Sequence, residues 1–202
     1  EFRIPDGDEK SIASVGERQV KYWVGFVKKA DWPQDQAGIG VFAHGKIAQD
    51  RPFTFGSKGG EIFTRYMYGV VEADWLDELP EDLISTDRTS VNWDADEAAP
   101  LMEWGRKKVG EWTRKFARWR REQEKAENRK RLDEADADGL AKVTAAEQER
   151  IIDLVSKITP RMGKDEEAKK RLVRAISDAW VQKPMQALVR DLWERLGDTE
   201  EG

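Results

Sequence analysis

The 202-residue sequence contains no cysteine and only one histidine, His44. Without cysteine the chain forms no disulfides, and it offers neither a thiolate nucleophile nor a thiolate metal site. A single histidine likewise excludes a metal cluster built from several imidazoles. These absences leave carboxylates, hydroxyls and basic side chains to carry any chemistry.

The sequence also lacks a long apolar stretch, although 39% of its residues are hydrophobic and 37% are charged. No run approaches the roughly 18 apolar residues of a membrane span, and the first residues do not read as an export signal. We therefore expect a cytoplasmic protein without membrane contacts. The chain begins with Glu1 and Phe2 rather than methionine, and we expect further sequence upstream.

The first part of the sequence predicts a sheet followed by a long helix. Residues 21–27, 39–47 and 66–73 are dense in β-branched and aromatic side chains, as strands are, and Gly45 indicates a turn or bulge in the second of them. From about residue 96, apolar side chains recur at helical spacing. The fold class predicted is therefore α/β (α+β), with residues 1–131 forming one domain that ends in a long charged helix.

Residues 132–202 predict an all-α region, which we interpret as a small helical bundle. Thr144 and Glu147 have the spacing of a capping box, in which each side chain satisfies a backbone N–H at the start of a helix. A second amphipathic pattern contains Leu172 and Trp180, and Pro184 favours the start of a third helix.

No nucleophile and base stand at a recognisable catalytic spacing, so we expect no catalysis by this chain alone. We interpret His44 as structural. The glycine-rich loop around Lys58 has backbone N–H groups that can cradle phosphate, but it lacks the spacing of a phosphate-binding loop, and a plain connection is the favoured interpretation.

An EF-hand-like register places oxygen ligands at Asp136, Asp138 and Glu147. Leu140 and Ala141 stand where this loop needs an oxygen ligand and a glycine, so a joint between two helices is the plainer interpretation. Calcium binding is kept as the alternative.

The strongest local charge lies between residues 106 and 131, where twelve basic residues stand against four acidic ones, a formal balance of +8. Arg118, Arg120 and Arg121 lie in this run, and Trp112 and Trp119 are interleaved with it. A basic helix with aromatic residues can contact nucleic-acid phosphates. The alternative, which we favour, is that the aromatic side chains pack inward and the basic face is solvated or docks on an acidic neighbour.

Three stretches, Gly38 to Ile47, Tyr68 to Asp74 and Ser85 to Trp93, followed by the long helix, resemble a known arrangement. It is similar to the second, transducer domain of the ATPase superfamily of gyrase, the ninety-kilodalton heat-shock chaperone, histidine kinases and MutL. The likeness is greatest to its microrchidia-like branch and bacterial relatives, and it covers about residues 20 to 120.

The resemblance implies a ribosomal-S5-like sheet, and a loop that sends a basic residue to the γ-phosphate of ATP bound in the preceding domain. Arg88 occupies the corresponding place, although it is followed by Thr89 where the microrchidia pattern has glutamine after a lysine. The alternative is that Arg88 bridges Asp87 or another nearby acid in a surface turn. ATP and Mg²⁺ would be held by the missing N-terminal ATPase domain, the principal partner. The family also allows a homodimer, and some bacterial relatives act in DNA maintenance or defence. The alternative to this transducer is a module that binds nucleic acid or protein through the basic helix.

Overall fold

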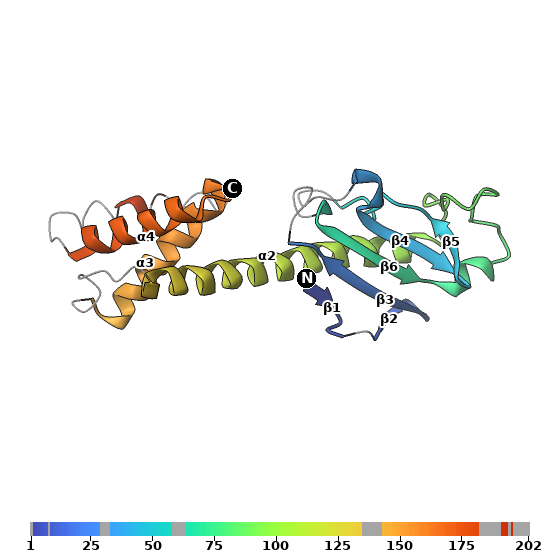
Figure 1. Ribbon diagram of the computed structural model, residues 1–202. Helices are drawn as coiled ribbons and strands as arrows, with labels where there is room; N and C mark the ends of the chain where they lie inside the picture. Colours follow the sequence, from blue (N-terminus) through green and yellow to red (C-terminus); the bar gives the residue numbers. More distant parts are fainter. Residues whose placement is uncertain are drawn as a thin grey trace. The chain divides into compact units, whose positions relative to one another are not determined.

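The computed structural model describes residues 2–7, 9–28, 33–57, 64–134, 143–181, 191–193 and 195. The chain divides into two compact units, Glu1–Trp119 and Arg120–Gly202. Helix α2 (Ala99–Glu134) contributes its first part to unit 1 and its last part to unit 2. Figure 1 labels the helices and strands along the chain.

Unit 1 is built on a mixed sheet of six strands. The strands are β1 (Phe2–Ile4), β2 (Ser11–Val15), β3 (Arg18–Phe26), β4 (Gly38–Ala43), β5 (Lys46–Gln49) and β6 (Met67–Glu72). The sheet order is β1-β3-β6-β4-β5, with β2 also paired to β3. The β4–β6 pair is parallel and the other pairs are antiparallel.

The predicted strands are confirmed, with one change in the second. Residues 39–47 form parts of two strands, β4 and β5, joined by a tight turn at His44 and Gly45. Both turn residues have positive φ, 48° and 74°, which is the backbone of the two-residue hairpin turns that match strand twist. Strands β1 and β2 were not predicted. They pair with successive parts of β3, opposite Val24–Phe26 and Arg18–Tyr22 respectively.

The first part of α2 packs its apolar stripe against one face of the sheet. Its contribution includes Leu101, Val109, Trp112 and Phe116, all at most 2% exposed. Phe116 stacks on Phe26 of β3 with ring centroids 4.4 Å apart. The long packing helix predicted from residue spacing is thus confirmed, beginning at Ala99.

Unit 2 combines the last part of α2 with α3 (Ala145–Ile158), a 3-10 turn η4 (Thr159–Met162) and α4 (Glu166–Val181). The Thr144–Glu147 capping box opens α3 as predicted. Its apolar core comprises Leu132, Ile151, Ile152, Leu154, Val155, Val173 and Trp180. Most of the helix predicted from Pro184 lies outside the described residues, and the described residues 191–193 and 195 are helical.

A buried polar cluster lies beside this apolar core. Asn128, 1% exposed, donates to Ser156 Oγ at 3.0 Å and to Thr159 Oγ1 at 3.1 Å. Its Oδ1 accepts from Arg131 Nη1 at 2.7 Å, and Arg131 Nη2 also pairs with Glu166 at 2.8 Å. Because each of these buried groups has a partner, the cluster fixes how the helices of unit 2 meet.

Candidate functional site at the Arg88 turn

The turn from Ser85 to Ser90 is closed by several hydrogen bonds. Ser85 N donates to Ser90 O at 2.9 Å, and Arg88 N donates to Ser85 O at 2.7 Å. Inside the turn, the Asp87 carboxylate accepts from Ser85 Oγ at 2.7 Å and from Thr89 Oγ1 at 2.9 Å. The hydrogen bond from the Ser85 hydroxyl, followed by those from Thr89, holds the pKa of Asp87 below its ordinary value. The turn is therefore ordered by its own side chains.

Arg88 projects from this turn in an unusual backbone conformation. Its φ is 56°, in the left-handed region that residues other than glycine seldom adopt. Its Nε donates to Ile47 O at 3.1 Å, and its Nη2 pairs with Asp77 Oδ2 at 2.7 Å. Two donors along one edge of the guanidinium are thus held, the side chain stays 34% exposed, and Nη1 has no hydrogen-bond partner among the residues that the structure describes.

Asp77, the acid that pairs with Arg88, belongs to a short 3-10 turn, η2 (Asp74–Asp77), that follows β6. At its start, Asp74 Oδ1 accepts from the backbone N–H of His44 at 2.6 Å. The His44 Nε2 lies 3.3 Å from Glu78 Oε1, and the imidazole is 52% exposed. We name Arg88, His44, Asp74, Asp77 and Glu78 the Arg88 cluster. It joins the β4–β5 turn, η2 and the Ser85–Ser90 turn.

The Arg88 cluster sets one guanidinium against three carboxylates, so the group in it that can contact an anion is Arg88 itself. The guanidinium is paired with Asp77, its Nη1 has no partner among the described residues, and a planar fork of this kind suits phosphate oxygens. His44, interpreted as structural from the sequence, pairs through its backbone with Asp74 and through its ring with Glu78. Its contacts therefore order the neighbouring turn.

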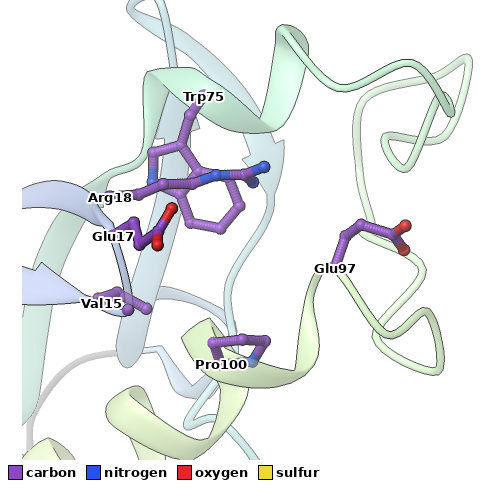
Figure 2. Close-up of a pocket in the computed structure, with 7 residues that line it drawn as sticks. Val15, Glu17, Arg18, Trp75, Glu97 and Pro100 are labelled. Carbon is purple, nitrogen blue, oxygen red and sulfur yellow. The ribbon is translucent and has the colours of Figure 1, made fainter.

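A pocket of about 240 Å³ includes Trp75 of η2 in its lining (Figure 2). It is lined by Val15, Gly16, Glu17, Arg18, Trp75, Glu97 and Pro100. The Arg18 guanidinium lies over the Trp75 ring, 4.5 Å from its centroid, and the Glu97 carboxylate points away from that ring. Its volume falls below the roughly 300–1,000 Å³ typical of ligand pockets, so it does not suit a whole nucleotide.

The basic residues predicted on the long helix lie in two units. Arg118 is exposed in unit 1, and Arg120 and Arg121 are exposed in unit 2, where each already makes an interaction. Trp112 and Phe116 are buried against the sheet, and Trp119 packs on Phe116 at 5.9 Å. The favoured interpretation of the aromatic residues, that they pack inward, is confirmed. Among the aromatic side chains of α2, Trp104 and Trp119 stay half-buried, and none is fully exposed.

The weaker predicted sites fall largely outside the described residues. Lys58, Asp136 and Asp138 are all among the residues that the structure leaves undescribed. Glu147 is described, and its Oε2 accepts from both the backbone N–H and the hydroxyl of Thr144 at 2.8 Å. The backbone N–H of Thr144 is the main cause that lowers the pKa of Glu147. This carboxylate is engaged in helix capping, and no group of three candidate metal ligands occurs within the described residues.

The ion pair of Arg88 matches the alternative that it bridges a nearby acid, but sequence reasoning named neither Asp77 nor the Ile47 carbonyl. Asp77 and the Ile47 carbonyl lie 11 and 41 residues away in sequence. The only signal for the first was the acidic run Asp74, Asp77 and Glu78 directly after a strand.

Comparison of the chain with protein-family models, with curated proteins and with solved structures finds no match. In the part of the chain that the structure describes, no helix is both long and apolar enough to cross a membrane.

Proposed function

We propose that this chain is the transducer segment of a larger, cytoplasmic ATP-driven protein, and that Arg88 contacts the γ-phosphate of ATP held by a separate ATPase domain. The observation that carries the proposal is the fixed geometry of Arg88. A side chain held through two of its nitrogens, in a backbone conformation that costs free energy, is typical of a group positioned for a ligand.

The pairing with Asp77 fits a nucleotide sensor. A γ-phosphate that approaches the exposed edge would find the guanidinium already oriented, so little side-chain entropy is lost on contact. ATP and Mg²⁺ are assigned to the ATPase domain, and this chain relays the nucleotide state to its C-terminal helices. The resemblance of residues 20 to 120 to such transducers supports the same role, including a homodimer and a link to DNA maintenance or defence.

The test is steady-state ATP turnover by the parent protein with Arg88→Ala. Removal of one donor that stabilises transition-state charge costs about 10²- to 10³-fold in turnover, and we expect a loss of at least about 10²-fold with ATP binding largely retained.

Asp77→Asn is the matched control, because it weakens the same anchor but leaves the guanidinium in place. Thermal melting should fall by similar amounts in the two variants, whereas turnover should fall far more in Arg88→Ala. Equal losses of turnover in both would show that Arg88 only anchors the turn, and unchanged turnover would remove it as the sensor.

A module that binds nucleic acid through α2 is the second candidate. Lys107, Arg114, Lys115 and Arg118 are exposed and recur at helical spacing on one side of the helix in unit 1. Four phosphate contacts predict that the logarithm of duplex affinity falls with the logarithm of salt concentration at a slope near −3.6. Binding titrations at several salt concentrations with Arg114→Gln and Arg118→Gln test this, since each substitution should reduce the slope by about one.

A further inference from the structure

The face of the sheet opposite α2 carries large side chains that stay partly exposed. Along β6, Met67, Gly69 and Val71 are buried, while the alternate residues Tyr68 and Val70 are only half-buried. On neighbouring strands the same face carries Trp23 and Phe42, with Ile12 63% and Ile47 38% exposed. We name Ile12, Trp23, Phe42, Ile47, Tyr68 and Val70 the open sheet face.

Glycines on this face make room for aromatic rings. Tyr68 lies opposite Gly25, and its ring carbon Cζ is 2.5 Å from where a Cβ of residue 25 would be. Phe42 lies likewise 2.9 Å from the missing Cβ of Gly40. Trp23 packs its ring edge-on against Tyr68, with centroids 5.6 Å apart. The rings therefore rest against the backbone and against one another in defined positions.

Cations surround these rings. The Arg3 guanidinium lies 4.8 Å from the centroid of Trp23. Arg51 reaches across Gly40 to donate from Nη2 to Gly69 O at 2.7 Å, and its Nε is buried without a hydrogen-bond partner. Lys21, two residues before Trp23, is exposed on the same face.

Within the described strands, the open sheet face has a single carboxylate, that of Glu72, which lies opposite Lys21 of β3. It already accepts from Lys10 Nζ. The local charge is therefore positive, although the whole chain carries a formal −5.

We propose that the open sheet face binds single-stranded nucleic acid. Unpaired bases stack on aromatic side chains and Arg planes, while basic residues beside them meet the phosphates. A duplex does not fit this chemistry, because its bases are already stacked. A protein partner fits less well than a nucleic acid, since lysine is depleted in protein interfaces and the face combines exposed Lys21 with two arginines. The proposal does not depend on Arg88 or on ATP.

The test is fluorescence polarisation of labelled dT15 and U15 oligonucleotides with the full chain at about 50 mM salt. Tyr68→Leu removes a stacking ring and should weaken binding about tenfold, whereas Tyr68→Phe keeps the ring and should retain affinity. Lys21→Gln removes an exposed charge without placing a second carboxylate opposite Glu72, and it should weaken binding about fivefold and flatten the salt dependence. A difference between dT15 and U15 tells which sugar is preferred.

Arg171→Gln on an exposed position of α4 is the matched control, because it removes a cation from a helix with no assigned binding role, and it should leave oligonucleotide binding unchanged. The proposal is overturned if the folded chain binds neither oligonucleotide, or if Arg114→Gln on α2 abolishes binding while Tyr68→Leu and Lys21→Gln do not. It is also overturned if an acidic apolar peptide binds in a manner sensitive to Tyr68→Leu and the oligonucleotides do not.

Discussion

Two glycines of α2 should respond in opposite directions to the same substitution. Gly105 faces the sheet core, where a Cβ would lie 2.2 Å from Cγ and 2.3 Å from Cδ1 of Phe55. Gly110 is spaced one and a half turns away, and its nearest neighbour would be the flexible end of Arg114 at 3.6 Å. Alanine in a helix interior is favoured over glycine by about 1 kcal/mol at either position.

At Gly105 this gain is outweighed by overpacking. Phe55 is fully buried, its φ is 54°, and its ring packs against Phe53 at 4.7 Å and Trp93 at 5.7 Å. The ring has little room to retreat, so the cost should reach the upper part of the usual range, about 3 kcal/mol. The expected net loss for Gly105→Ala is about 2 kcal/mol. Gly110→Ala should stabilise by about 0.5–1 kcal/mol.

Denaturant unfolding followed by tryptophan fluorescence measures both variants. Seven of the nine tryptophans belong to residues 1–119, so the signal reports mainly on unit 1. The double variant with Phe55→Leu supplies the control, because a smaller side chain should relieve the overpacking and give a coupling energy of about 1 kcal/mol. If Gly105→Ala is as stable as Gly110→Ala, the packing argument is refuted.

Two further outcomes follow from hydrogen-bonded carboxylates. Thr144→Ala should destabilise α3 by about 1 kcal/mol, seen as a lower midpoint by circular dichroism, while Glu147→Gln should cost less because glutamine can still close the box. Because the pKa of Asp87 is lowered on folding, its contribution to stability is present above the unfolded pKa near 3.9 and is lost as pH falls through the folded value. Ser85→Ala should raise the pKa of Asp87 toward its ordinary value, and an NMR titration of the carboxyl carbon that shows no change would contradict the assigned cause.

The helices and strands that were predicted correctly are those that depend on the residues of their own segment. The density of β-branched and aromatic residues in 21–27 identified β3, and the spacing of Thr144 and Glu147 identified the start of α3. Strands β1 and β2 were missed because they are short and their stability comes from pairing with β3.

Only part of the candidate site could be predicted from the sequence. The position of Arg88 followed from a resemblance, but its anchor at Asp77 depends on where η2 lies after folding. The aromatic residues of α2 were open to two interpretations, and burial of Trp112 against the sheet decided between them. Periodicity shows that residues share a helix face, and only packing shows whether that face meets solvent.

Glycine was the residue type that sequence reasoning used least well. A glycine in a strand or helix is normally interpreted as destabilising. It loses more backbone entropy on folding than other residues do, and it has no side chain to pack. Here Gly25 and Gly105 each leave the space that an aromatic ring occupies, Tyr68 on the sheet and Phe55 beneath the helix. A methyl group at Gly25 would have to displace Tyr68 from the backbone. Gly25→Ala should therefore weaken oligonucleotide binding as Tyr68→Leu does, if the position of that ring, and not its hydrophobicity alone, forms the binding surface.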